Sequence, residues 1–317
     1  MTGRASQMKM LAFVALALLA KGATPAIAQQ TQSEESERRS GVLRNLPEWA
    51  AKRQFGTQTT GAPMQARSIG SYARGCLAGG TALAVDGNQW QVMRLSRNRM
   101  WGHPDLVKYL ESFASKVPGS VGWNGILVGD ISQPRGGPML TGHASHQIGL
   151  DADIWLTPMP GRKLSGSERE NMSATNMARS DWLDIDPNVW TQNHTKLIRL
   201  AAQDSRVHRI FVNPAIKKAL CREAGSDRAW LRTVRPMWGH NYHFHIRMGC
   251  PVGLAGCAEQ DEPPEGDGCG QELTDWLNRQ YKAIFGPKPP PGPKRPPPAP
   301  WSMDALPQAC RDVVVAR

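Results

Sequence analysis

Residues 142–153, GHASHQIGLDAD, contain two histidines in a loop between glycines, followed by two closely spaced aspartates. The segment 150–154 alternates apolar residues with Asp151 and Asp153. Because successive side chains of a β-strand point to opposite faces, this alternation predicts a half-buried strand with both carboxylates on one face. A carboxylate buried without a partner is unstable by several kcal/mol, so an inward acidic face needs a cation. The stretch therefore predicts a metal site at which His146 folds back over Asp153.

A second histidine pair, His243 and His245, flanks Phe244. On a strand the two imidazoles share one face, and the phenyl ring points the opposite way, into a core. Two neutral imidazoles and one carboxylate form a common ligand set for catalytic zinc and leave one position for water. Either pattern alone is usually structural or accidental. Together they predict a zinc site formed by His146, Asp153 and His245.

Amphipathic and short apolar segments follow one another along the chain from about residue 68 to residue 285. Helical spacing predicts helices, and short apolar runs between turn residues predict strands. The expected helices span 104–117, 196–202, 213–220 and 273–284, and the expected strands span 125–128, 150–154, 210–212 and 244–248. These segments contain no internal repeat. They predict a single α+β domain in which a small antiparallel sheet carries the zinc site, surrounded by helices and loops and stapled by disulfides.

The first 28 residues have the pattern of a signal peptide. Arg4 and Lys9 precede an apolar run over 10–20, and residues 26–28 form an A-x-A cleavage site before Gln29. This arrangement predicts export to the periplasm with cleavage after residue 28. No later apolar run approaches the roughly 18 residues that a membrane-spanning helix needs, so no membrane span is expected in the mature protein.

Composition divides the remaining chain into three parts. Residues 29–66 are polar and weakly patterned, which predicts a flexible N-terminal arm. Residues 67–286 are expected to form the catalytic domain. The tail, 287–317, begins with a proline-rich spacer, which predicts an extended and semi-rigid segment.

The chain contains six cysteines, at positions Cys76, Cys221, Cys250, Cys257, Cys269 and Cys310. An even number in an exported chain predicts three disulfides, although six cysteines allow many pairings and their spacing does not choose among them. Cys250 and Cys257 are close enough to close a small loop. No two cysteines have the spacing of a structural zinc site. Because Cys310 lies in the tail, we expect a disulfide to hold that end against the body.

The net charge of +11 suits a polyanionic partner such as nucleic acid, an anionic membrane or the acidic polymer of a bacterial cell wall. The sequence lacks zinc-finger spacing, a helix-turn-helix signature and an aromatic RNA-binding strand. Nucleic acid is therefore not the expected partner.

Three strings together resemble the LAS-type zinc peptidases and, more closely, the penicillin-insensitive murein endopeptidases. The strings are GSYARGC at 70–76, the stretch 142–153, and H-x-x-H-x-H at 240–245. The resemblance extends from about Ile69 to Trp276. It implies zinc ligands at His146, Asp153 and His245, a catalytic His243 beside the metal, and an accessory active-site His240.

The resemblance also implies further metal positions at His143, Asp181 and Asp184, the last of which is a carboxylate where the family has an imidazole. It implies the disulfides Cys76–Cys310, Cys221–Cys269 and Cys250–Cys257.

The expected activity is zinc-dependent, penicillin-insensitive hydrolysis of murein cross-links of the D-alanyl–meso-diaminopimelyl type. His243 would accept the proton of the attacking water, and His240 would donate to the oxyanion. Ser145 lies outside a G-x-S-x-G elbow, so a serine nucleophile is not expected. The alternatives are a D,D-carboxypeptidase or dipeptidase of the same superfamily, and a non-catalytic module that binds zinc or cell wall.

Overall fold

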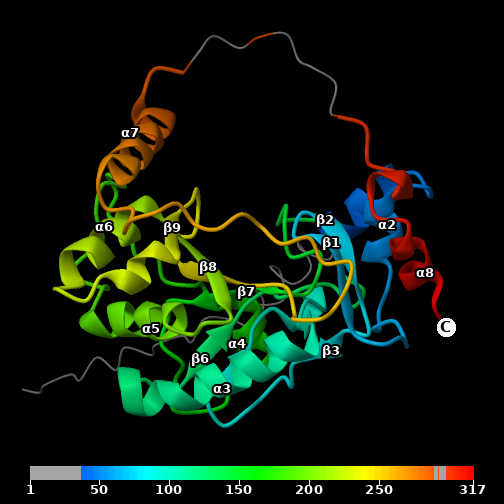
Figure 1. The fold of residues 1–317 in the computed structure, drawn as a ribbon, viewed down its shortest axis with the longest axis horizontal. Helices are drawn as coiled ribbons and strands as arrows, with labels where there is room; N and C mark the ends of the chain where they lie inside the picture. Colours follow the sequence, from blue (N-terminus) through cyan, green and yellow to red (C-terminus); the bar gives the residue numbers. More distant parts are fainter. Residues whose placement is uncertain (1–36, 289–291, 293–297) are drawn as a thin grey trace, which may run out of the picture.

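A mixed six-stranded sheet lies at the centre of the computed structural model, which describes residues 37–288, 292 and 298–317 (Figure 1). The predicted signal peptide at 1–28 lies outside the described residues. In spatial order the strands are β4 (Trp90–Val92), β6 (Ile126–Val128), β7 (Asp151–Trp155), β10 (His243–Met248), β8 (Val207–Val212) and β9 (Val234–Pro236).

The predicted α+β class is confirmed, but the sheet is larger than expected and is not purely antiparallel. The pairs β4–β6 and β8–β9 at its two edges are parallel, whereas the inner strands β6, β7, β10 and β8 are antiparallel to one another. An apolar run indicates a strand without indicating which neighbour it pairs with or in which direction. The strands expected to carry the metal site do form the antiparallel centre.

The helices begin where the local sequence supplies a cap. In α3 (Pro104–Val121) the side chain of His103 accepts the N–H of Asp105, and the helix ends at Gly122, which has a φ of 86°. In α6 (Pro214–Glu223) the side chain of Asn213 accepts the N–H of Ala215. Both helices have proline in the first turn, where its missing N–H costs nothing. Three further helices are α4 (Gly166–Asn171), α5 (Gln192–Ala202) and α7 (Gln271–Phe285), and α5 packs against α3.

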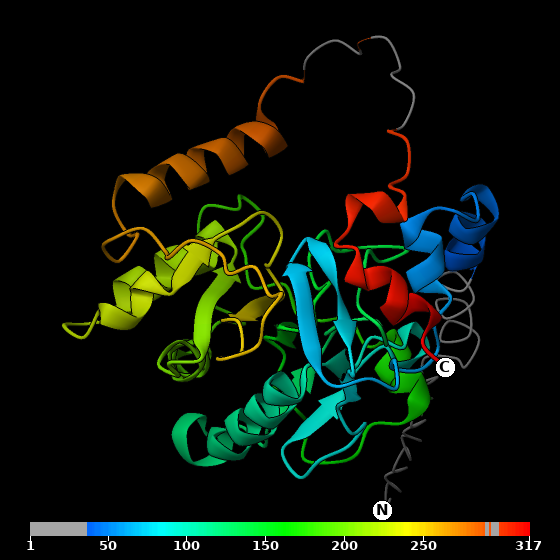
Figure 2. The ribbon, with the colours of Figure 1, turned by 45° about the vertical axis from the view of Figure 1, so that its right-hand side comes forward.

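A second, smaller core lies beside the sheet and joins the two ends of the described chain. It contains the hairpin of β1 (Arg67–Ser71) and β2 (Arg74–Ala78), with α2 (Ala51–Gly56) and α8 (Ala309–Val315) packed against it. Figure 2 shows α2 and α8 side by side, far from α7.

The expected flexible arm at 29–66 is therefore wrong for its later part, because Phe55 is fully buried in the second core. Ala50 also pairs with Ser302 across the two ends of the chain. The short helix escapes sequence analysis because six residues provide too few turns to show a periodic pattern.

The rest of the fold comprises the strand pair β3 (Thr81–Ala82) and β5 (Trp101–Gly102) and the 3₁₀ turns η1 (Leu95–Arg97), η2 (Ala229–Arg232) and η3 (Met303–Ala305). None of the described helices has the length and apolar character needed to cross a membrane.

Three disulfides form, with the pairing that the family resemblance implies: Cys76–Cys310, Cys221–Cys269 and Cys250–Cys257. The first joins β2 to α8 across 234 residues of sequence, whereas the last closes a loop with a separation of 7.

Replacing both Cys76 and Cys310 with serine should lower the free energy of unfolding by about 2–5 kcal/mol, the usual contribution of a long-loop disulfide. The physical reason is the larger conformational entropy of an unfolded chain that has lost this long loop. Denaturant titration of the metal-saturated protein measures the effect. The double variant of Cys250 and Cys257 is the control and should lose less. An equal or larger loss in the control would contradict the prediction.

Candidate metal centre

The candidate metal centre lies on the two inner strands β7 and β10. In their register His245 is opposite Asp153, His243 is opposite Trp155, and Arg247 is opposite Asp151. Directly opposed residues of an antiparallel pair point to the same face, so the histidines and aspartates share one face of the sheet. The intervening apolar residues, among them Ala152 and Phe244, point into the main core.

The loop between Gly142 and Gly149 holds His146 over this face. Gly149 has a φ of 70°, and a Cβ there would lie 2.6 Å from Leu77 and 2.9 Å from the backbone nitrogen of His103. His146 itself has a φ of 65°. A left-handed backbone at a residue other than glycine costs roughly 1–3 kcal/mol and is concentrated at functional sites.

Two contacts orient the ring of His146. Its backbone N–H donates to Asp151 Oδ2 at 2.9 Å, and its ring Nδ1 lies 2.6 Å from the carbonyl oxygen of Ile131. A carbonyl only accepts, so Nδ1 carries the ring proton. In the neutral ring Nε2 therefore presents a lone pair, and it lies 3.4 Å from Asp153 Oδ1. Burial disfavours the charged ring, but the Asp153 carboxylate outweighs it and raises the pKa of His146, so this pair of atoms requires a proton or a metal between them.

His245 is arranged in a similar way. Its Nε2 lies 3.0 Å from Asp151 Oδ1 without the geometry of a hydrogen bond, and its Nδ1 lies 3.4 Å from Asp153 Oδ1. A carboxylate this close to Nε2 favours the tautomer that carries the proton there. Burial lowers the pKa of His245 to about 3, so the ring is neutral at physiological pH.

Lone pairs from His146, His245 and Asp153 thus converge in a buried space. His146 Nε2 and Asp153 Oδ1 are both buried and accept no hydrogen bond. Without a cation these atoms would repel one another. For Asp153, burial raises the carboxyl pKa, but the surrounding imidazoles, led by His243, outweigh it and hold the pKa well below its usual range. The donor set of two imidazole nitrogens and one carboxylate oxygen fits a divalent metal such as zinc.

His143 also lies close to this set. Together with His146 and Asp153 it forms a compact group whose ligand atoms lie within 4.8 Å of one another. However, its Nε2 is 3.0 Å from Asp130 Oδ2 and 3.6 Å from Asp153 Oδ2. Because both neighbours are acceptors, this nitrogen carries the proton and presents no lone pair. His143 thus faces the two carboxylates as a proton donor, whereas His146 and Asp153 present lone pairs.

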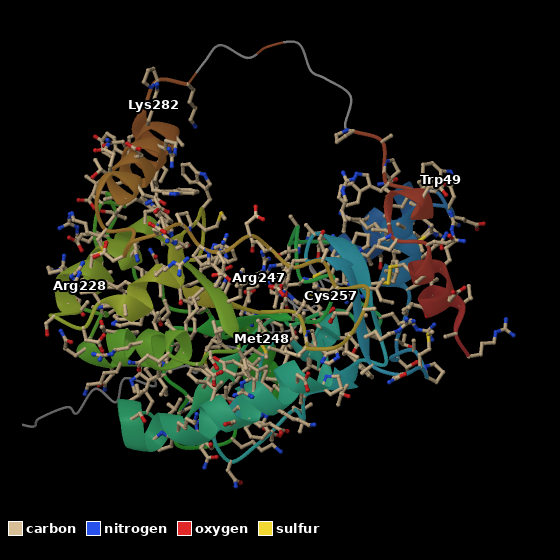
Figure 3. The ribbon with its side chains drawn as sticks, viewed as in Figure 1. Trp49, Arg228, Arg247, Met248, Cys257 and Lys282 are labelled. Carbon is tan, nitrogen blue, oxygen red and sulfur yellow. A yellow bond between two sulfur atoms is a disulfide. The ribbon has the colours of Figure 1, made fainter. Side chains whose placement is uncertain are left out.

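Asp151 does not need a metal, which corrects the expectation that the whole acidic face does. Arg247, on the neighbouring strand, donates to both of its oxygens, at 2.8 and 3.1 Å. The guanidinium in turn lies 4.1 Å from the ring centroid of Tyr72. Figure 3 shows Arg247 near the middle of the molecule, whereas Arg228 and Lys282 lie at its rim. The spacing H-x-H-x-R could have revealed this partner, because Arg247 shares its strand face with His245.

His243 and His240 lie beside the candidate ligands. His243 Nε2 is 3.6 Å from Asp153 Oδ1, and its Nδ1 is buried without a hydrogen-bond partner. Burial lowers the pKa of His243 to about 4, so its ring is neutral at pH 7 and able to accept a proton. The ring centroid of His240 is 4.9 Å from that of His243, and its Nδ1 lies 2.7 Å from the carbonyl oxygen of Trp238.

The structure does not bring Asp181 and Asp184 into this group. Asp181 pairs with Arg179 at 2.6 Å. Asp184 pairs with Arg222 at 3.0 Å and Lys218 at 3.3 Å. Within the described ranges, the only group of three residues suited to a metal is the one that contains His146 and Asp153. Asp181 and Asp184 are thus already neutralised by arginine and lysine.

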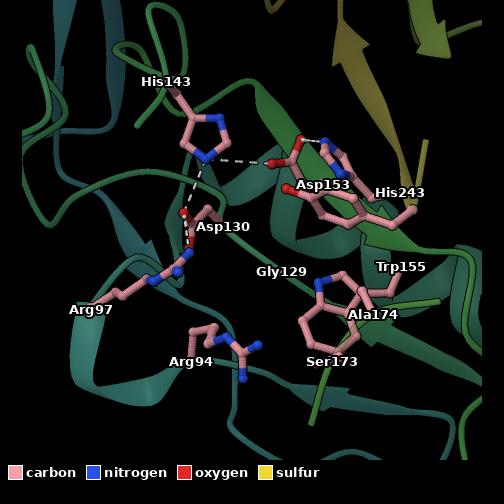
Figure 4. Close-up of a pocket in the computed structure, with 11 residues that line it drawn as sticks. Arg94, Arg97, Gly129, Asp130, His143, Asp153, Trp155, Ser173, Ala174 and His243 are labelled. Atoms are coloured by element: carbon pink, nitrogen blue, oxygen red, sulfur yellow. Dashed lines mark hydrogen bonds and ion pairs between the residues drawn. The ribbon is translucent and has the colours of Figure 1, made fainter. Parts of the chain in front are cut away.

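The candidate centre opens into a pocket of about 240 Å³, shown in Figure 4. Asp153 and His243 line one part of it, with Trp155 and Tyr242 nearby, and Arg94 also contributes to its wall. Of the three candidate ligands only Asp153 lines this pocket, so a substrate there would meet the centre at Asp153 and at the neighbouring His143 and His243.

Replacing Asp151 with asparagine should weaken metal binding by roughly 10–100-fold, as expected for a group that orients a ligand. The variant would lose the carboxylate that holds the His245 ring and would leave the charge of Arg247 unpaired. Competition with a chromophoric chelator measures metal affinity directly. Asp184→Asn is the matched control and should bind metal as tightly as the parent. Unchanged affinity in Asp151→Asn, or an equal loss in the control, would contradict this role.

An α+β fold whose central strands place two imidazoles and a carboxylate around a buried cation site, with a neutral histidine beside them, defines a metallopeptidase-like centre. The chain belongs to the penicillin-insensitive murein endopeptidase family, whose model matches residues 68–315. This match includes α8, so the family model continues beyond the predicted domain end at 286.

Individual relatives agree with this assignment. The chain is 45% identical to a penicillin-insensitive murein endopeptidase of Klebsiella pneumoniae (strain 342) over 244 residues, which covers 76% of this chain and 86% of that protein. It is 48% identical to the protein of the same name from Haemophilus influenzae over 215 residues, 67% of this chain and 74% of the relative. A relative from Pectobacterium atrosepticum is 45% identical over 240 residues, 76% of this chain and 83% of that protein.

Proposed function

We propose that this protein is a zinc-dependent murein endopeptidase that hydrolyses the peptide cross-links of peptidoglycan, of the D-alanyl–meso-diaminopimelyl type. The observation that carries the proposal is the convergence of His146 Nε2, His245 Nδ1 and Asp153 Oδ1 without a hydrogen-bonding partner for His146 or Asp153. Family membership and the relatives' names support the substrate class.

His146, Asp153 and His245 would hold the zinc. Each presents a lone pair at the shared space, whereas His143 directs a proton toward Asp130 and Asp153. Asp151 orients His245 and His146 from behind, and Arg247 keeps Asp151 ionised. The zinc, when bound, polarises a carbonyl and makes water a better nucleophile near neutral pH.

The remaining chemistry falls to His243 and His240. His243 is neutral at physiological pH, and its Nε2 is oriented toward the ligand carboxylate at 3.6 Å. It accepts the proton of the attacking water and returns it to the leaving amine. His240 lies beside it with its Nδ1–H directed at the carbonyl of Trp238, so its Nε2 donates a hydrogen bond to the oxyanion on the scissile carbonyl only when the ring is protonated.

This mechanism uses no covalent nucleophile. All six cysteines of the described chain are in disulfides. Ser145 lies in the loop that carries His146, and the sequence around it lacks a nucleophile elbow. Penicillin acylates an active-site serine, so an enzyme of this kind would be insensitive to it.

The periplasm is the proposed location. A long-range disulfide between Cys76 and Cys310, and two further disulfides, require an oxidising compartment. The A-x-A sequence at 26–28 is consistent with removal of an export signal.

Digestion of purified cross-linked muropeptide dimers tests the proposal. The zinc-loaded protein should convert dimers to monomers, dialysis against a chelator should stop the reaction, and zinc should restore it. A D,D-carboxypeptidase would instead release alanine from monomers and leave the dimers intact. A binding module would form no product from either substrate. Either result, alanine release with intact dimers or no product at all, would overturn the proposed function.

A further inference from the structure

The wall of the pocket beside the metal centre carries two guanidinium groups, those of Arg94 and Arg97. Figure 4 shows both side chains at the pocket, together with Asp153 and His243. Neither arginine belongs to the ligand set or to the proton-transfer pair, so the proposed chemistry leaves them without a role.

The guanidinium of Arg94 uses only some of its N–H donors in hydrogen bonds to the rest of the described chain. Its guanidinium donates to the backbone carbonyls of Arg169, Glu170 and Met172, and it lies 5.2 Å from the ring centroid of Trp155. An arginine has five N–H donors, so two remain. In the part of the chain that the structure describes, no carboxylate lies within 4.0 Å of the Arg94 guanidinium. The charge is thus held by carbonyl dipoles and is not neutralised by a neighbouring anion.

The backbone conformation and a backbone hydrogen bond fix the position of Arg94. Arg94 has a φ of 56°, and Asn98 at the other end of the η1 turn has a φ of 50°. The backbone N–H of Arg94 donates to the carbonyl of Arg169 at 3.1 Å, so main chain and side chain are both tied to the same segment. Left-handed residues of this kind persist where the surrounding structure over-determines them, commonly at ligand sites.

The arginines around the pocket favour binding of an anion. Asp130 is shared by Arg97 at 3.2 Å, Arg99 at 2.9 Å and His143 at 3.0 Å. Arg94 and Arg97 line the pocket with Asp130 and Asp153, the Glu170 carboxylate near Arg94 is held by the N–H and hydroxyl of Ser96, and a divalent metal would add positive charge. Burial and the nearby Arg97 lower the pKa of Arg94, and the carboxylates of Glu170 and Asp130 oppose that effect without cancelling it.

We infer that this pocket binds a free carboxylate of the substrate through Arg94, with Arg97 adding to the positive potential. The inference rests on the proposed function and names the part of the substrate that the site selects. In a diaminopimelyl cross-link, a carboxylate is attached to the same carbon as the leaving amine. A guanidinium beside the metal centre would hold this carboxylate and so position the scissile bond. Charge-assisted pairing to arginine is the strongest kind of hydrogen bond available for this purpose.

Two cross-linked muropeptide dimers test the inference, one with this carboxylate free and one with a carboxamide in its place. The parent enzyme should cleave the carboxamide dimer with a kcat/KM lower by roughly 10–100-fold, the range for losing a charged hydrogen-bond partner. Arg94→Gln should lose a similar factor on the carboxylate dimer and should cleave the two dimers within about twofold of each other. Arg74→Gln, an exposed arginine that lies over Trp301, is the matched control and should keep the full preference.

Two results would overturn the inference: equal cleavage of both dimers by the parent enzyme, or a full carboxylate preference in Arg94→Gln. The parent comparison needs no variant, so it decides the matter even where Arg94→Gln fails to fold. Calorimetric binding of both dimers to zinc-loaded His243→Ala separates recognition from chemistry. Tighter binding of the carboxylate dimer without cleavage by the parent enzyme would reject the proposed function alone. Equal binding of the two dimers would reject the carboxylate site.

Discussion

Replacing His243 with alanine is expected to reduce turnover by roughly 10²–10⁴-fold, the range for a positioned general base. Its Nε2 lies 3.6 Å from Asp153 Oδ1, which places the ring beside the candidate ligands. Its Nδ1 is buried without a partner, and its low pKa leaves the ring neutral and able to take a proton. Because His146, Asp153 and His245 supply three ligands, the variant should retain nearly stoichiometric zinc and the parent fold.

Zinc content and cleavage of muropeptide dimers are to be measured on the same preparation. If zinc is lost together with activity, His243 is a fourth ligand and the site is a closed, structural one. If activity is retained, His243 is neither base nor ligand. His208→Ala is a suitable control, because this histidine lies on β8 near Glu262, outside the candidate site, and its removal should leave zinc content and turnover unchanged.

Replacing His146 or His245 with alanine is expected to abolish activity and to lower zinc content below stoichiometric. Loss of a direct ligand should weaken metal affinity by more than about 100-fold, the upper end for residues that only orient a ligand. His146 Nε2 and His245 Nδ1 each lie 3.4 Å from Asp153 Oδ1, so removal of either imidazole leaves an incomplete set of metal ligands.

His143→Ala is the informative comparison for this pair of variants. The compact group of His143, His146 and Asp153 would make His143 a ligand, whereas its 3.0 Å contact with Asp130 makes it a proton donor. We expect His143→Ala to keep its zinc. Equilibrium dialysis followed by metal analysis compares the three variants. Loss of zinc from His143→Ala, with retention in His245→Ala, would replace our ligand set by the compact group.

Much of the candidate site could be predicted from local sequence. The alternation around Asp153 correctly placed the two carboxylates on one face of β7, and the H-x-H spacing correctly placed the two imidazoles on one face of β10. Arg247 was missed, because its importance depends on the carboxylate it meets on a different strand. Arg94 was missed for the same reason, since the carbonyls that hold it come from residues 169–172.

The sequence by itself determined the strand faces, the helix cap at Asn213, the even number of cysteines and the types of side chain available for a metal. These features depend on periods of two or 3.6 residues and on neighbours within a single turn, so they are visible in a short window. Only the tertiary structure placed β7 beside β10 with His245 opposite Asp153, and gave Asp151 an arginine partner. It also packed the two ends of the chain into a second core. These outcomes depend on which distant segments bury their surfaces together, and periodicity along the chain carries no information about that choice.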